Sequence, residues 1–332
     1  MRPRRSARSP ARPRPYSPSE VGSFESRVAA ATRALVLGIG GGGDAVGCLA
    51  VARQLEARGL DWVVGGVAWE RFPVDPHPGP RPLSEIREAT PLDAGAALVD
   101  PRRGATTPEG AHFCESRLAG FLDRTTVLID VTGGAPGAAA GIAAAATELE
   151  CDLVLLVDIG GDAIAAGDEP GLASPLCDAV MIAAAVEAGE RLSCLLGVLG
   201  AGCDGELRPA EVLERVAILA EAGAWLATVG VSPDAAAEIE EAAAVAVTEA
   251  SLLVARCARG TIGPVEIRGG RRTVEAGPVG ALCFLFDLDA AFGCLPLARA
   301  VAGKPSIAEA HAALESLGIG TELGYELRRA AD

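Results

Sequence analysis

Aromatic side chains are scarce in this sequence, at 4% of the 332 residues, although 50% of all residues are hydrophobic. Ala, Val, Leu and Ile must therefore fill the interior, as they do in layered proteins whose helices pack on a sheet. A chain of this length is long enough for one large domain or two modest domains with a full core. The composition favours the α/β class.

Long apolar runs are also missing. No segment has the roughly 20 uninterrupted apolar residues that a membrane-spanning helix needs, and the first residues contain no apolar stretch typical of a signal peptide. The nine cysteines form no C-x-x-C pair and most lie in apolar patterns, so we expect reduced, buried thiols. These absences predict a cytoplasmic protein without a membrane partner.

Positive charge is in short supply as well. The 29 Lys and Arg residues face 44 Asp and Glu residues, which gives a formal net charge of -15. Such a field repels a phosphate backbone, so nucleic acid is not an expected partner. The exception is the N-terminal segment, where arginines alternate with Pro and Ser. That composition cannot bury apolar surface, so we predict a disordered basic tail over residues 1–30.

Several well-known catalytic motifs are absent. The sequence contains no G-x-S-x-G elbow, no H-E-x-x-H helix and no G-x-x-x-x-G-K-[ST] loop. Each of these motifs places a nucleophile, a zinc ion or a phosphate in a defined local structure. Their absence argues against hydrolases and P-loop kinases of those types.

From residue 34 onward the chain repeats one unit: a short apolar run, a turn rich in Gly and Asp, and an alanine-rich helical stretch. This alternation is typical of parallel strands that are covered by helices on both faces. We predict strands at 34–38, 62–68, 126–131, 153–157 and 195–199. We predict helices at 44–58, 138–148, 176–188 and 209–222, and one long helix from Pro233 to about Arg256.

The pattern changes near residue 259. Residues 263–275 predict a β-hairpin around the turn Gly269-Gly270, and an apolar strand at 281–286 and a helix at 305–316 follow it. The sequence therefore predicts a single Rossmann-like α/β domain over residues 31–322, with a mostly parallel sheet, helices on both faces and a C-terminal β-hairpin. Residues 323–332 are charged and are expected to be loose. The exposed hairpin and the apolar strand would suit a homodimer.

The turn after the first predicted strand is rich in glycine. It has the G-x-G-x-x-G spacing that lets the backbone approach a phosphate at a helix N-terminus. Glu70 ends the second predicted strand, where dinucleotide-binding folds place the acid that binds ribose. We therefore expect a ligand at this turn. Its glycines are Gly38, Gly40, Gly41, Gly42 and Gly43.

Asp44 follows these glycines directly and changes the expectation. Its carboxylate would face a pyrophosphate, and two anions at close range repel each other unless a cation lies between them. NAD is therefore less favoured than a nucleotide or phosphate bound through Mg²⁺ or Mn²⁺, or than a sugar-like ligand without phosphate. The simpler alternative is that Asp44 only caps its helix.

Three later turns repeat glycine and aspartate at the end of a predicted strand. In an open parallel sheet such ends meet at one crevice, beside the point where the strand order reverses. Concentrated carboxylates need a hard cation, an arginine or raised pKa values. A divalent-metal site, an acid and base pair, and recognition of hydroxyl groups therefore all stay open. The predicted catalytic residues are Asp130, Asp158, Asp162 and Asp204, the predicted metal ligands are Asp44, Asp158 and Asp162, and the further glycines expected to bind a cofactor are Gly133, Gly134, Gly160, Gly161 and Gly202.

Candidates for substrate binding lie near these turns. Arg71 could clamp an anion through two hydrogen bonds, or it is a solvated surface residue. The loop at 167–175 is too rich in Gly and Pro to be helical and adds polar groups. Thr248 and Ser251, inside the predicted long helix, have a role at the site or, more simply, solvate the helix. The candidates are Arg71, Asp168, Glu169, Ser174 and Glu206.

Several ordered motifs resemble one known family. They run from Gly38 to Gly47, from Gly65 to Arg71, from Asp130 to Gly134, from Asp158 to Asp162 with Gly171 to Asp178, from Cys203 to Leu207, and from Ile267 to Arg272. With the chain between them they span residues 33–322 and resemble the family called domain of unknown function 1152, found in archaea and bacteria. The resemblance implies a Rossmann-like α/β protein. The family has no established activity, so it transfers no residue role.

Together these observations predict an enzyme that acts on a nucleotide, a nucleoside or another polyhydroxylated or phosphorylated small molecule. Its site would be carboxylate-rich, metal-assisted and located at the carboxyl ends of the strands. A hydrolase or transferase is favoured over a dehydrogenase. The alternative is a nucleotide- or metabolite-binding protein without catalysis, in which the aspartates cap helices or hold ribose hydroxyls.

Overall fold

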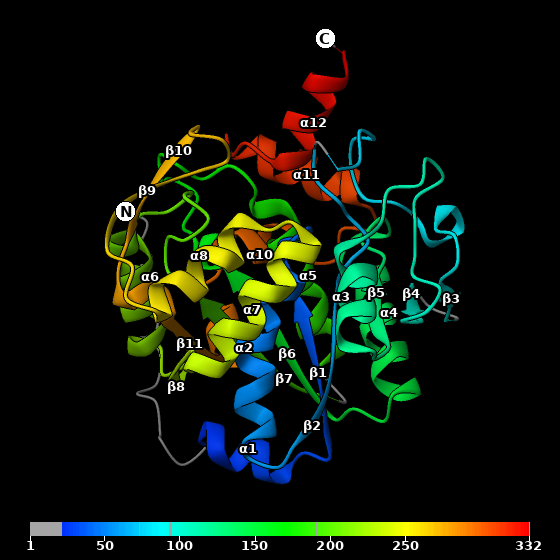
Figure 1. Cartoon of the computed structure of the whole chain (residues 1–332). Helices are drawn as coiled ribbons and strands as arrows, with labels where there is room; N and C mark the ends of the chain where they lie inside the picture. Colours follow the sequence, from blue (N-terminus) through cyan, green and yellow to red (C-terminus); the bar gives the residue numbers. More distant parts are fainter. Residues whose placement is uncertain (1–21, 73, 93–94, 190–191, 332) are drawn as a thin grey trace, which may run out of the picture.

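The computed structural model describes residues 22–72, 74–92, 95–189 and 192–331, and its centre is a nine-stranded sheet (Figure 1). In sheet order the strands are β3 (Thr90–Pro91), β4 (Ala96–Val99), β5 (Thr126–Ile129), β2 (Asp61–Val67), β1 (Arg33–Gly38), β6 (Leu153–Ile159), β7 (Ser193–Leu199), β11 (Leu282–Asp287) and β8 (Trp225–Gly230). The strands from β5 to β7 are parallel, whereas β4 pairs antiparallel with β5, and β11 pairs antiparallel with β7 and β8. The predicted mostly parallel sheet is confirmed.

Helices cover both faces of this sheet because its inner strands bury side chains on both faces. One face packs against α4 (Gly134–Glu148) and α5 (Pro175–Ala188), and the other against α2 (Asp44–Glu56), α7 (Pro233–Ala246) and α8 (Glu249–Ala258), which lie in front in Figure 1. In β1, Leu35 and Leu37 point into the first core, whereas Ala34 and Val36 alternate with them and point into the second. The predicted two-sided α/β architecture is confirmed.

The remaining elements connect or flank these layers. The other helices are α1 (Phe24–Ala30), α3 (Cys114–Leu122), α6 (Pro209–Glu221), α9 (Leu288–Phe292), α10 (Pro296–Val301), α11 (Ile307–Ser316) and α12 (Glu322–Ala331), with short 3-10 turns η1 (Leu83–Glu85), η2 (Asp162–Ile164) and η3 (Pro278–Ala281). The predicted hairpin is present as β9 (Gly263–Ile267) and β10 (Arg272–Ala276). No helix in the described ranges has both the length and the apolar character that a membrane crossing requires.

The order of the strands reverses next to β1. From β1 the chain moves to β2 and β5 on one side, and then returns past β1 to β6 and β7 on the other side. The loops that follow β1 and β6 therefore leave the sheet at the switch point, where open α/β sheets bind ligands. The loop after β5 leaves the sheet two strands away from β1.

The single long helix predicted after residue 232 is wrong, because the chain divides it into α7 and α8. Val247 follows α7 with a left-handed backbone (φ 57°), and Thr248 is extended. Both residues are β-branched and therefore weak helix formers. Thr248 packs against Gly43, where an added Cβ would lie 2.2 Å from the threonine Oγ1 atom, and the Ser251 hydroxyl donates a hydrogen bond to the Gly43 carbonyl (3.0 Å). The break places α8 on the glycine loop.

Both chain ends differ from the prediction. Residues 323–332 were expected to be loose, but α12 reaches residue 331 and Glu326 within it is buried. Its carboxylate accepts hydrogen bonds from Trp69 Nε1 (3.0 Å) and from the Gly79 N–H (2.7 Å). At the other end, α1 buries Phe24 inside the predicted basic tail, whose residues 1–21 lie outside the described residues.

Replacing Glu326 with alanine is expected to destabilise the protein. The substitution leaves the Trp69 indole N–H and the Gly79 N–H without their acceptor, at a cost of about 1 to 3 kcal/mol for each buried group. We therefore expect the free energy of unfolding, measured with urea, to fall by about 2 to 5 kcal/mol. The control is Arg329→Ala, an exposed position on the same helix. Equal stability of the two variants would contradict this role of α12.

Candidate functional site

The loop between β1 and α2 carries Asp44 to the switch point. The Asp44 carboxylate accepts a hydrogen bond from the Gly40 N–H (2.9 Å), so it closes the glycine loop. Arg71, from the segment after β2, donates a hydrogen bond to the Gly40 carbonyl. The loop has no room for a side chain at Gly38, where an added Cβ would lie 2.6 Å from the Ala45 nitrogen. Packing alone therefore requires glycine at this position, independently of any phosphate.

Asp44, Asp158 and Asp178 form a first carboxylate group, which we call the inner triad. One carboxylate oxygen from each residue lies within 4.8 Å of the other two. Asp158 lies near the end of β6 and Asp178 in the first turn of α5, and both are 1% exposed. Among the described residues, neither Asp158 oxygen has a hydrogen-bond partner, and Oδ1 of Asp178 has none. Buried acceptors without donors are costly, so this triad needs a cation or protons.

Asp162, Asp204 and Glu206 form a second group, the outer triad, whose oxygens also lie within 4.8 Å of one another. Asp162 begins η2 directly after β6, and Asp204 lies in the turn after β7. Gly160 has a backbone conformation reserved for glycine (φ 125°), and an added Cβ there would lie 2.1 Å from Oδ1 of Asp204. The glycine lets the two loops approach each other closely enough to form the triad.

Glu206 differs from the aspartates because its hydrogen-bonding capacity is full. Its carboxylate accepts hydrogen bonds from the N–H groups of Ala173 (2.7 Å) and Ser174 (2.8 Å), from the Ser174 hydroxyl (2.5 Å) and from the Arg272 guanidinium (3.2 Å). These donors use the lone pairs of both oxygens. Oδ1 of Asp204, in contrast, is buried without a partner among the described residues. Glu206 therefore anchors the loop before α5, and the inner triad is the better cation site.

Burial is the main electrostatic influence on both triads. It raises the pKa of Asp44 to about 7, although the Gly40 N–H and the charge of Arg71 act in the opposite direction. Burial, followed by the charge of Glu206, likewise raises the pKa of Asp204 to about 7. Both carboxyl groups are therefore poised to exchange a proton near neutral pH.

The pKa values of the three remaining aspartates are raised further than those of Asp44 and Asp204. Burial, and then the charges of Asp44 and Asp204, raise the pKa of Asp158 well above its usual range. Burial also raises the pKa values of Asp162 and Asp178 well above the usual range, with neighbouring carboxylates as the second cause. The charges of Asp44, from the inner triad, and of Asp204, from the outer triad, both act on Asp158. The two triads therefore form one continuous electrostatic site.

All residues of this site lie within the part of the chain that matches a known protein family. The family model described as "Protein of unknown function (DUF1152)" matches residues 35–330, which include every member of both triads. The chain belongs to this family. No curated protein matches the sequence. Membership in the DUF1152 family supplies no reaction, so the roles of the triads rest on their geometry.

The structure brings most of the predicted acidic residues together, but it places Asp130 elsewhere. The Asp130 carboxylate accepts hydrogen bonds from the Thr132 N–H (2.8 Å) and the Leu83 N–H (3.0 Å). It follows β5, two strands from β1, so it holds its own loop instead of joining the triads. Gly133 and Gly134 belong to this same loop and start α4, away from the switch point. Their predicted ligand role has no support in this arrangement.

Three other predicted residues also lie outside the triads. The Glu70 carboxylate, predicted to bind ribose, is buried and accepts a hydrogen bond from the Cys114 N–H at the start of α3. Glu169 closes its own loop by accepting hydrogen bonds from two N–H groups within it (2.7 and 2.8 Å). Asp168 is exposed. The nearby Ser174, in contrast, reaches the outer triad through Glu206. Of the predicted cofactor-binding glycines, Gly40 donates a hydrogen bond from its N–H group to Asp44. Gly160, Gly161 and Gly202 lie in the two loops of the outer triad, where they make close contacts that leave no room for a side chain.

Sequence reasoning missed Asp178, although a signal for it exists. Asp178 is a single acidic residue within the otherwise apolar first three turns of α5. Glu322, from α12, was also missed; its carboxylate accepts hydrogen bonds from the Leu176 N–H (3.1 Å) and the Cys177 N–H (2.8 Å). The C-terminal helix thereby fixes the first turn of the helix that carries Asp178. Glu322 also pairs with Arg71 (3.3 Å).

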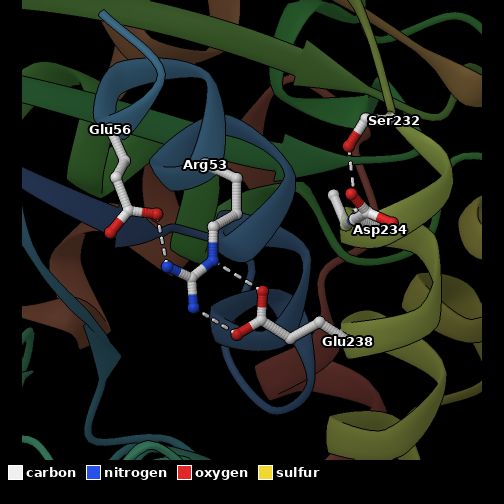
Figure 2. Close-up of a pocket in the computed structure, with 6 residues that line it drawn as sticks. Arg53, Glu56, Ser232, Asp234 and Glu238 are labelled. Atoms are coloured by element: carbon white, nitrogen blue, oxygen red, sulfur yellow. Dashed lines mark hydrogen bonds and ion pairs between the residues drawn. The ribbon is translucent and has the colours of Figure 1, made fainter. Parts of the chain in front are cut away.

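A surface hollow between α2 and α7 is separate from the triads (Figure 2). In it, the Arg53 guanidinium donates hydrogen bonds to Glu238 (2.7 Å from Nε) and to Glu56 (2.5 Å). Figure 2 shows these three side chains turned toward one another. Both glutamates are paired with the guanidinium, so this hollow lacks the buried carboxylates without partners that distinguish the triads.

The inner triad predicts an unusual pH dependence of stability in the metal-free protein. Burial holds the pKa of Asp44 at about 7 in the folded protein against 3.8 for an ordinary aspartate, so the folded state keeps a proton that the unfolded chain loses. The contribution of this group to stability therefore falls as the pH rises from about 4 to about 7. Asp44→Asn keeps an acceptor for the Gly40 N–H and removes this fall.

Between about pH 4 and about pH 7, we expect the free energy of unfolding of Asp44→Asn to rise by about 1 to 2 kcal/mol relative to that of the wild type. The partial exposure of Asp44 keeps this difference below the value that the full pKa shift would give. Urea unfolding in the presence of a chelator measures the difference. Asp168→Asn, at an exposed position, is the matched control. A constant difference between Asp44→Asn and the wild type over this pH range would rule the prediction out.

Proposed function

We propose that the protein is an enzyme that binds Mg²⁺ or Mn²⁺ at the inner triad and acts on a nucleotide, a nucleoside or another phosphorylated or polyhydroxylated small molecule. The observation that carries the proposal is Asp158. Both of its carboxylate oxygens are buried without a hydrogen-bond partner among the described residues. The strongest charges acting on it are other carboxylates. Such a group is stable only when protons or a cation compensate it.

A hard divalent cation suits the inner triad better than an arginine does. Three carboxylate oxygens from separate elements converge within 4.8 Å, and oxygen ligands are those that Mg²⁺ and Mn²⁺ prefer. The triad lies at the switch point of the sheet, where ligands of open α/β folds bind. Asp44 is partly accessible to solvent, whereas Asp158 and Asp178 are buried, so the inner triad is open on the side of Asp44. A substrate can therefore approach from the side of Asp44.

The aspartates of the outer triad supply proton transfer in this proposal. A bound cation would polarise a phosphoryl or carbonyl oxygen, or lower the pKa of a water molecule. Asp204, whose pKa burial raises to about 7, can release and accept a proton near neutral pH. Asp162 lies beside it and follows β6, the strand that carries Asp158 near its end. Glu206, whose oxygens are fully engaged, holds the loop in place.

Dehydrogenase activity with NAD fits the geometry less well. The acid expected to bind ribose, Glu70, points toward α3 and accepts a hydrogen bond there. The carboxylate of Asp44 faces the glycine loop, where it would repel a pyrophosphate. The second candidate function is ligand binding without catalysis, which product formation distinguishes from the first. A cytoplasmic location, a small-molecule ligand rather than nucleic acid, and a homodimer stay predictions from the sequence.

Metal binding is the first test of the proposal. We expect about one equivalent of Mn²⁺ per chain in isothermal titration calorimetry, and a midpoint of thermal unfolding that rises with Mn²⁺. Asp158→Asn removes a ligand charge at constant shape and should weaken Mn²⁺ binding by about 10-fold or more. Asp168→Asn, exposed and outside the triads, should bind like the wild type. Equal affinity in the wild type and Asp158→Asn would refute the site.

Turnover is the second test. Nucleotides, nucleosides, sugars and sugar phosphates are incubated with the protein and Mn²⁺ or Mg²⁺, and products are detected by chromatography. The double variant Asp162→Asn with Asp204→Asn should lower kcat by about 100-fold or more, because it removes the proton-transfer groups. Its Mn²⁺ affinity should fall by less than that of Asp158→Asn, since the three residues of the inner triad stay in place. Ligand binding without any product would favour the binding-protein alternative.

A further inference from the structure

The hairpin formed by β9 and β10 lies at the end of the sheet toward which β1 points (Figure 1). Two contacts fix it there. The Arg272 guanidinium donates hydrogen bonds to the Asp204 carbonyl and to the Glu206 carboxylate (both 3.2 Å). The Glu249 carboxylate, at the start of α8, accepts a hydrogen bond from the Arg268 N–H. The hairpin therefore joins the outer triad to the helix that packs on the glycine loop.

Arg268 stands at the turn of this hairpin in a defined conformation. Its backbone is left-handed (φ 54°), which is uncommon for a residue with a side chain and which surrounding contacts must maintain. The Glu249 contact holds its N–H group, and its carbonyl accepts a hydrogen bond from Arg271 Nε (2.9 Å). The backbone that carries the Arg268 side chain is thus held from both sides.

The charge of Arg268 acts on both triads. It opposes the effect of burial and lowers the pKa values of Asp44 in the inner triad and Asp204 in the outer triad. The side chain is nevertheless exposed and forms no ion pair within 4.0 Å among the described residues. Arg71 and Arg272 differ, because Glu322 and Glu206 engage them. Arg268 is therefore free to bind a ligand that reaches the triads.

We propose that Arg268 binds a phosphate group of the substrate beside the cation at the inner triad, so that the substrate is a phosphate ester and not an uncharged nucleoside or sugar. This inference rests on the proposed function. The carboxylates repel an anion, so a phosphate is accepted only where positive charge outweighs them locally. A cation at Asp44 and the guanidinium of Arg268 supply that charge on the accessible side of the site. A guanidinium also matches two phosphate oxygens at once, which a lysine does not.

The test measures binding of inorganic phosphate to the full chain in saturating Mn²⁺ by isothermal titration calorimetry. Arg268→Ala is expected to weaken phosphate binding by about 10-fold or more, because a charge-assisted pair of hydrogen bonds is lost. The matched control is Arg256→Ala, an exposed arginine of α8 with no ion pair among the described residues, which should bind phosphate within about twofold of the wild type. Arg268→Lys keeps the charge without the fork and should retain part of the affinity.

The Mn²⁺ titration of the same proteins separates this inference from the function on which it rests. Normal Mn²⁺ binding with no phosphate binding, or with equal phosphate affinity in Arg268→Ala and Arg256→Ala, overturns the role of Arg268 and leaves the cation site standing. Failure of the wild type to bind Mn²⁺ overturns both. D-ribose is the uncharged comparison. If ribose binds and phosphate does not, the substrate is not a phosphate ester.

Discussion

The structure depends on one constraint: carboxylates are buried without hydrogen-bond donors, and their charge has to be compensated. Asp158 occupies the interior strand β6, between β1 and β7, so it cannot turn to solvent. Every neighbouring element then has to accommodate concentrated negative charge. The aspartates resist ionisation because burial raises their pKa values. Large alanine-rich cores on both faces of the sheet offset the cost of this arrangement.

The site is also held by long-range contacts that converge on its first loop. Glu322 caps the helix that carries Asp178 and pairs with Arg71, and Arg71 donates to the Gly40 carbonyl in the loop that Asp44 closes. The interrupted helix after residue 232 serves the same end, because its second half packs on that loop. The sheet thus places the aspartates, and peripheral helices fix their loops. Such support is what keeps a preorganised site at a defined geometry.

The sequence was sufficient to predict the inner strands and the residues at their ends. Continuous apolar runs followed by glycine and aspartate identified Asp158 and Asp204, because parallel strands bring such ends together. Strand order was not available, so Asp130 was grouped with them although β5 lies two strands from β1. Asp178 and Arg268 lie on a crossover helix and on the hairpin, whose places depend on non-local packing. Local pattern does not contain that information.

The contact between Arg71 and α12 has a consequence for the order in which the protein forms during synthesis. The two partners of the Arg71–Glu322 hydrogen bond are 251 positions apart in the chain. At about 5 to 20 residues per second, a ribosome adds the glutamate roughly 13 to 50 s after the arginine. During that interval the last strand of the sheet is synthesised, but the α5 N-terminus and the glycine loop still lack their C-terminal carboxylate. The carboxylate centre is therefore among the last parts of a newly made molecule to mature.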